Sequence, residues 1–167
     1  MEYFLLLMYS TGENVALDNQ PMESIMTTDA NRKAESAPIL VEIAPGELLD
    51  KITILQIKTE RMTDPAKVKN VQVELAILAK TRQESMVASA ELTKLEGQLK
   101  AVNERLWDIE DEIRVCERKQ DFGPPFIALA RAVYHENDHR AALKKSINQL
   151  LQSRIVEEKS YAPYSQT

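Results

Sequence analysis

The stretch LTKLEGQLKAVNERLWDIEDEIRVC, residues 92–116, decides the fold of this chain. Its apolar residues recur at alternating intervals of three and four positions. These residues are Leu92, Leu95, Leu99, Val102, Leu106, Ile109, Ile113 and Cys116. Only a helix that packs against another helix gathers such residues into one seam. The stretch therefore predicts a long helix in an all-α fold.

The composition of the 167-residue chain is that of one globular domain with a real core. Hydrophobic residues make up 44% and charged residues 28% of the chain, and 4 glycines and 7 prolines leave little material for an all-β fold. The formal net charge of −5 argues against a nucleic-acid partner. The single cysteine, Cys116, excludes an internal disulfide and is expected to be a small buried residue of the seam.

The two ends of the chain are expected to lie outside the folded domain, which we predict at residues 38–161. Residues 1–37 show no sustained apolar period, which predicts a disordered or loosely attached extension, and residues 162–167 form a C-terminal tail. The apolar run at residues 4–8 is too short to cross a membrane, and Glu2 in front of it is unlike a signal peptide. We therefore expect a cytoplasmic protein that does not bind membranes.

Three further helices are predicted around the central one, at residues 45–62, 65–86 and 125–152. Prolines at their starts suit the first helical turn, and the sequence DFGPP is a clear stop after the central helix. Apolar residues line one face of each helix, and on the second they are Val68, Val71, Leu75 and Leu78. Together the four helices predict an antiparallel bundle-like domain with a long heptad hairpin.

Two short β-branched segments flank this helical region, at residues 40–43 and 154–157. Both have the composition of strands. We expect them to pair as one short two-stranded β-ribbon that closes the domain.

The apolar stripe of the last helix is interrupted by Glu136, Asn137 and Arg140. In an antiparallel hairpin, Asn103 of the central helix is level with Arg140, and Trp107 is level with Glu136. Two interpretations stay open for this meeting of polar residues. It is either a buried hydrogen-bond network that sets register or a site that binds a ligand.

The candidate residues for binding a ligand or partner share this region of the hairpin. They are Asn103, Trp107, Asp108, Glu110, Asp111, Arg114, Asn137, Asp138 and Arg140. No catalytic residue is assigned among them, and no cofactor is expected.

Four pieces of the chain resemble an uncharacterised bacterial family of short helical proteins, classed as a domain of unknown function. The pieces are PGELLDKITILQIK, VNERLWDIEDEIR, FIALARAVYHENDHRAALKKSIN and IVEEKSY, and the resemblance covers about residues 39–161. Members of this family tend to sit near surface-polysaccharide and glycosyltransferase genes, so the resemblance implies a loose context and no activity.

The resemblance also implies which polar positions recur in the family. They are Glu47, Asp50, Lys51, Asn103, Trp107, Asp108, Glu110, Asp111, Asn137, Asp138, Arg140, Glu157, Glu158 and Lys159.

Residues 135–139 read HENDH, a literal match to the H-E-x-x-H pattern of zinc peptidases. That pattern places His135 and His139 on one helical face as metal ligands, and Glu158 follows at a distance suited to a third ligand. Against a zinc hydrolase stand the near absence of a predicted sheet and the place of both histidines outside the main apolar stripe.

Carboxylates offer a second enzymatic interpretation, a Mg²⁺-dependent nucleotide pyrophosphohydrolase built only from helices. The acidic residues would come from two facing helices, and basic residues nearby would bind phosphates. The acidic residues are Asp108, Asp111, Glu112, Glu136 and Asp138, and the basic ones are Arg114, Arg131, Arg140 and Lys144. A solvated acidic face balanced by neighbouring cations explains the same pattern. A helical dimer similar to chorismate mutase, suggested by residues 47–61, rests on a charged amphipathic helix alone.

The sequence therefore favours a non-catalytic binding or assembly module. Its partner, a protein or a small molecule, is not identified by any motif. The long heptads are compatible with a homodimer.

Overall fold

The computed structural model describes residues 37–160, and this part of the chain contains four α-helices and no strand. The chain divides after Ile39 into two units, and all four helices belong to the unit that begins at Leu40. The helices are α2 (Pro45–Arg61), α3 (Pro65–Ser85), α4 (Ala90–Lys119) and α5 (Pro124–Leu150). The predicted all-helical fold is confirmed. The expected N-terminal extension and C-terminal tail lie almost wholly outside the described residues.

The helices begin and end at the capping residues and prolines that the sequence indicates. Asp64 caps α3 by accepting hydrogen bonds from two backbone N–H groups, and Ser89 caps α4 by accepting from the N–H of Leu92 at 3.1 Å. At the end of α4, Gln120 adopts a left-handed conformation with φ 53°, and its N–H bonds back to the last turn. Gly123 and the prolines that follow it then start α5.

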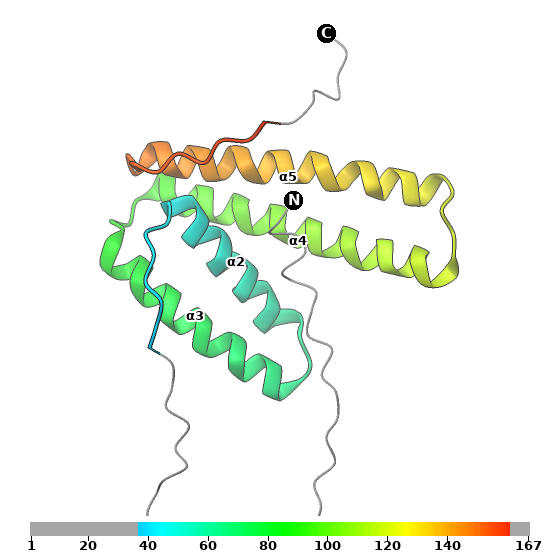
Figure 1. The fold of residues 1–167 in the computed structure, drawn as a ribbon, viewed down its shortest axis with the longest axis horizontal. Helices are drawn as coiled ribbons and strands as arrows, with labels where there is room; N and C mark the ends of the chain where they lie inside the picture. Colours follow the sequence, from blue (N-terminus) through cyan, green and yellow to red (C-terminus); the bar gives the residue numbers. More distant parts are fainter. Residues whose placement is uncertain (1–36, 161–167) are drawn as a thin grey trace, which may run out of the picture. The chain divides into compact units, whose positions relative to one another are not determined.

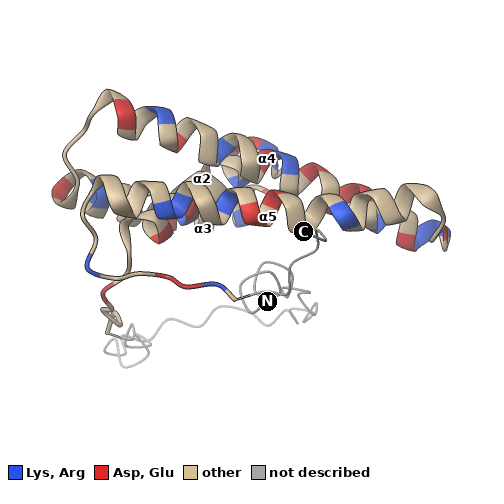
Figure 2. Cartoon of the chain, turned by 90° about the horizontal axis from the view of Figure 1, so that it is seen from above, with Lys and Arg blue, Asp and Glu red and all other residues tan. Residues whose placement is uncertain are grey.

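Helices α4 and α5 lie side by side and run in opposite directions (Figure 1). Helix α2 contacts all three other helices, since it crosses the α4–α5 hairpin and also packs along α3. Acidic and basic residues are interspersed along the helices (Figure 2). Within residues 37–160, no helix has the length and apolarity required to cross a membrane.

The hydrophobic core forms where α2 crosses the hairpin. It consists of Leu48, Leu49, Ile52, Leu92, Leu99, Val102, Leu106, Leu143 and Ile147. Helix α3 has no buried residue, and Leu75 and Leu78 reach only the edge of this core. The predicted apolar stripe of α3 is therefore half-buried, because α2 alone covers that helix.

The far half of the hairpin, residues 107–142, is here called the arm. None of its residues is buried, whereas buried residues occur on α4 up to Leu106 and on α5 from Leu143. The seam residues of the arm, Cys116 included, are only partly buried because α4 and α5 cover one another from one side each. The expectation that Cys116 is fully buried is therefore wrong.

The expected β-ribbon does not form in the described residues. Segments 40–43 and 154–157 contain no strand, and a bidentate ion pair between Arg154 and Glu42 connects them instead. An isolated two-stranded ladder is marginally stable, so β-branched composition alone does not produce one.

Two glycines test the packing of this fold in opposite directions. A Cβ atom at Gly46 would lie 2.6 Å from the carbonyl oxygen of Lys144, whereas one at Gly97 would meet no atom within 4 Å. We expect Gly46→Ala to lower the free energy of unfolding by about 1–3 kcal/mol through overpacking. The matched Gly97→Ala should raise it by about 0.5–1 kcal/mol, because alanine is the better helix former. Urea denaturation measures both, and a destabilised Gly97→Ala with a neutral Gly46→Ala would contradict the packing described here.

Candidate functional site

A buried polar network joins three helices where α2 crosses the hairpin. Its centre is the Asp50 carboxylate, which lies in a residue only 1% exposed. Asn103 of α4 donates from Nδ2 to Asp50 Oδ1 at 2.9 Å, and Arg140 of α5 places Nη2 3.0 Å from Asp50 Oδ2. Asp50 thereby connects α2 to both helices of the hairpin.

The remaining groups of this network are also paired. The Asn103 amide donates a second hydrogen bond to Thr53 Oγ1 at 2.9 Å, and that hydroxyl donates to the Asp50 carbonyl oxygen at 2.9 Å. Arg140 approaches Asn137 Oδ1 at 3.4 Å, and the Asn137 amide donates to the Val133 carbonyl oxygen at 2.9 Å. In the described residues, no buried side-chain nitrogen or oxygen lacks a partner. This completeness favours a structural network over an open binding site at this position.

A second buried charge lies one turn further along α5. Lys144, whose side chain is 7% exposed, places Nζ 2.5 Å from Glu47 of α2 and 2.8 Å from Glu157 of the segment after α5. Next to it, the Gly46 N–H donates to Asn148 Oδ1 at 2.7 Å. Lys144 therefore holds the start of α2 and the segment after α5 against the same helix.

Burial and pairing act against each other on these groups. Burial alone would lower the pKa of Lys144, but hydrogen bonds with Glu157 and Glu47 outweigh it and raise that pKa above its ordinary value. Burial likewise disfavours the charged form of Glu157, yet the hydrogen bond from Lys144 lowers the pKa of this carboxyl below its ordinary value. Both groups are therefore charged at neutral pH.

The structure brings together three of the sequence-predicted residues, namely Asn103, Asn137 and Arg140. The sequence predicts that Asn103 and Arg140 lie at the same level along the hairpin. The structure agrees, since both side chains reach the Asp50 carboxylate.

The other candidates lie apart from the buried network. Asp108 forms an ion pair with Arg61 at the end of α2, and Glu110 pairs with Arg114 at 3.2 Å along α4. Trp107 is partly buried on the arm, whereas Asp111 is exposed. Asp138 lies partly buried on α5.

Residue reasoning alone missed the partners that α2 contributes. Asp50 and Glu47 stood among the positions implied by the family resemblance, while Thr53 was not singled out. Lys144 was considered only as a phosphate ligand, and it is committed to two carboxylates instead. A lysine within the apolar stripe of α5, between Leu143 and Ile147, was the available signal for a buried cation.

The zinc interpretation acquires no ligand set in the described residues. His135 and His139 are exposed, and His139 lies 4.0 Å from Glu136. Within the part of the chain that the structure describes, no three His, Cys, Asp or Glu side chains are grouped to hold a metal ion. Glu158 belongs to no such group with the two histidines.

The chain belongs to a family of unknown function (DUF6165), whose model matches residues 39–167. The resemblance drawn from its sequence is thereby confirmed. No curated protein and no solved structure gives a significant match. All four helices and both buried ion clusters fall inside the matched range.

The Asp50 network makes a quantitative prediction about stability. Arg140→Met leaves the buried Asp50 carboxylate without its cation, so we expect the free energy of unfolding to fall by on the order of 3 kcal/mol. The control Arg105→Met removes the same side chain from an exposed ion pair with Glu136, which should change stability by at most about 1 kcal/mol. Urea denaturation at pH 7 compares the two variants, and equal losses would contradict the structural role of Arg140. Adding Asp50→Asn to Arg140→Met should restore part of the loss.

The Lys144–Glu157 pair predicts a dependence on acid. Because the pKa of Glu157 is lowered in the folded state, its stabilising contribution is present above about pH 4.5 and is lost as the pH falls through the folded value. The urea midpoint of the wild type should therefore exceed that of Glu157→Gln at pH 7, and the difference should shrink toward pH 3. Glu158→Gln is the matched neighbour and should differ little from wild type at pH 7. A difference for Glu157→Gln that is constant across this pH range would refute the assignment.

Proposed function

We propose that the chain is a non-catalytic assembly module whose arm binds the arm of a second copy. One observation carries this proposal, namely that residues 107–142 form two helices with apolar side chains and no buried residue. Two helices alone bury too little apolar surface to be stable and need a further layer of secondary structure. When two hairpins pack together as a four-helix bundle, each hairpin provides that layer for the other.

The face available to a second copy continues the face that α2 covers. On α5, α2 contacts Arg140, and steps of one heptad toward the turn lead to Val133 and Phe126. On α4, α2 contacts Asn103, and Trp107 lies one turn further. We call the surface made by Trp107, Glu110, Arg114, Phe126 and Val133 the open arm face. Its three apolar side chains are only partly buried.

The size of this surface is compatible with a specific dimer. The arm includes 13 residues of α4 from Trp107 to Lys119 and therefore extends about 20 Å, and two adjacent helices are about 20 Å wide. The projected area is on the order of 400 Å², and side-chain relief raises the accessible area toward the roughly 800 Å² per partner of standard interfaces. One whole side of the arm is thus large enough for a modest homodimer.

The charges on the open arm face are self-complementary. Glu110 and Arg114 lie one helical turn apart and carry opposite charges. A two-fold axis near Glu112 would place Glu110 of each copy opposite Arg114 of the other. Symmetric homodimers use such isologous contacts, in which one patch meets itself.

The partner of this assembly in the cell is a separate question. The role in surface-polysaccharide biosynthesis, which comes from the family resemblance, stays a prediction. The zinc interpretation is not proposed, because the described residues offer it no grouped ligands. The magnesium interpretation is not proposed either, because a solvated acidic face balanced by cations explains the same carboxylates.

Self-association is testable with the full chain. In sedimentation equilibrium at micromolar concentration, we expect about twice the 19.0 kDa of one chain. Val133→Glu places a charge in the open arm face and should give a monomer, because a buried unpaired carboxylate opposes association. Trp107 should show a blue-shifted fluorescence emission in the dimer relative to that monomer.

Ile127→Glu is the matched control for this experiment. Ile127 is 55% exposed on the arm and lies outside the open arm face, so the same substitution should leave the dimer intact. Circular dichroism confirms that each variant keeps its helices. A monomeric wild type, or a Val133→Glu variant as dimeric as Ile127→Glu, would refute the proposal.

A further inference from the structure

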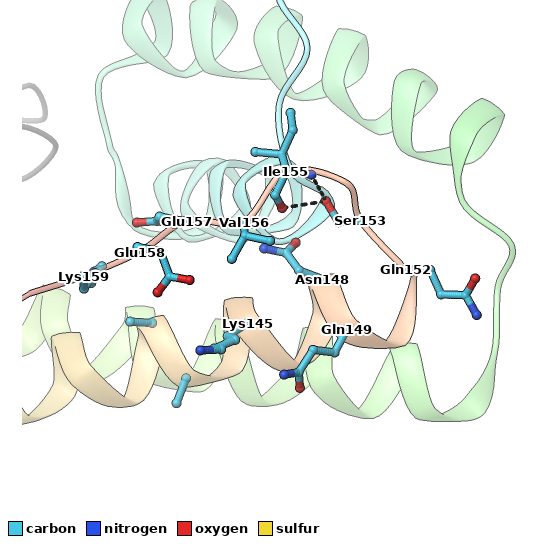
Figure 3. A pocket seen from close by; sticks show the side chains of 12 residues that line it. Lys145, Asn148, Gln149, Gln152, Ser153, Ile155, Val156, Glu157, Glu158 and Lys159 are labelled. Atoms are coloured by element: carbon cyan, nitrogen blue, oxygen red, sulfur yellow. Dashed lines mark hydrogen bonds between the residues drawn. The ribbon is translucent and has the colours of Figure 1, made fainter.

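A pocket of about 320 Å³ lies between the second half of α5 and the segment that follows this helix. Helix α5 contributes one wall, which includes Ala142, Lys145 and Gln149, and residues 153–159 contribute the other (Figure 3). The pocket adjoins the residues that bind α2, because Asn148, which accepts the hydrogen bond from the Gly46 N–H, also lines it. It shares Glu157 with the buried Lys144 cluster and shares no residue with the open arm face.

The segment that roofs the pocket is held by specific contacts. Gln152 adopts a left-handed conformation with φ 52°, which reverses the chain after α5, and the Ser153 N–H donates to the Asn148 carbonyl oxygen at 2.8 Å. Further along, Arg154 pairs with Glu42, and Glu157 pairs with the buried Lys144 at 2.8 Å. The pocket is thus built by three separate attachments of one extended segment.

The helix wall contributes the cation Lys145, and the roof contributes the carboxylate of Glu158. Within residues 37–160, neither Lys145 on the helix wall nor Glu158 on the roof forms an ion pair. The Glu158 carboxylate is directed toward α5 (Figure 3). In contrast, Glu157 already forms an ion pair with Lys144.

The net charge around the pocket is balanced. Two cations and two carboxylates line it, so the formal sum is zero. The cations are Lys145 and Lys159, and the carboxylates are Glu157 and Glu158. A polyanion such as a nucleotide would therefore meet no excess of positive charge.

We propose that this pocket binds a small zwitterion of amino-acid size. Lys145 would receive the carboxylate of the ligand, Glu158 would receive its ammonium group, and the side-chain amide of Gln149 would supply a further polar contact. Ala142 and Val156 leave an apolar part of the lining for a ligand side chain. The pocket is at the small end of ligand-binding cavities, which suits a metabolite better than a polymer.

Saturation-transfer NMR on the full chain, with the twenty amino acids added at millimolar concentration, tests this proposal. We expect a signal from at least one amino acid, and titration calorimetry then gives its Kd. Lys145→Met and Glu158→Gln should each weaken that Kd by about tenfold or more, since each removes one charge-assisted contact. Ala142→Leu should also abolish binding by filling the pocket without changing any charge. Lys69→Met, an exposed lysine of α3, is the control and should bind like the wild type.

Glucose and inorganic phosphate, each added alone, separate the other ligand classes. If glucose binds and still binds to Lys145→Met and Glu158→Gln, the proposal of a zwitterion ligand is overturned and the pocket is a polyol site. Binding of phosphate that depends on Lys145 alone would indicate an anion site instead. The absence of any amino-acid signal would also overturn the proposal. Sedimentation of the same samples reports the dimer separately, so failure of one proposal does not mimic failure of the other.

Discussion

The Asp50 carboxylate binds two helices at once, and the arrangement of the other helices depends on it. Asn103 of α4 and Arg140 of α5 reach its two oxygens, so α2 has one permitted position across the hairpin. Apolar side chains of similar size could fill the same volume, but they would not distinguish one register from another as a directional network does. The tight approach of Gly46 to α5 depends on this position, because a shift of α2 would move its backbone away from Lys144 and Asn148.

Much of the local structure could be predicted from the sequence, because it follows from nearby residues. The three-and-four spacing that ends at Cys116 predicts α4, and prolines and the DFGPP turn predict the boundaries around it. Because α4 and α5 form an antiparallel hairpin whose turn position is evident from the sequence, Asn103 and Arg140 could be placed at the same level along it. Their shared partner, Asp50, could not be predicted in this way. An aspartate in an amphipathic helix has the same sequence pattern whether it lies on the surface or in the core. Which residue of α2 meets the hairpin is a long-range property that periodicity does not encode.

Periodicity also predicts which face of a helix is apolar, but not how many neighbours cover it. Leu75 of α3 and Ile113 of α4 both occupy regular heptad places, and both are only partly buried. In each case a single helix covers the seam from one side, whereas Leu99 lies under α2 and beside α5 and is fully buried. The β-ribbon failed for a related reason. Residues such as Val41 and Val156 favour extended backbone, yet a ladder needs a partner strand at the correct distance, and here the Glu42–Arg154 ion pair spans the two segments instead.

Helix α5 separates the two proposed sites while connecting them physically. Its α2-facing side leads from Lys144 through Arg140 to Val133 on the open arm face, and a different side carries Lys145 at the pocket. Groups on separate faces and more than two helical turns apart contribute independently unless they share a partner. Lys144 is such a partner, because it pairs with Glu157 on the roof of the pocket and with Glu47 at the start of α2. Coupling between ligand binding and assembly therefore has three described routes: this buried lysine, α5 itself, and the Arg154–Glu42 ion pair that attaches the roof segment just before α2.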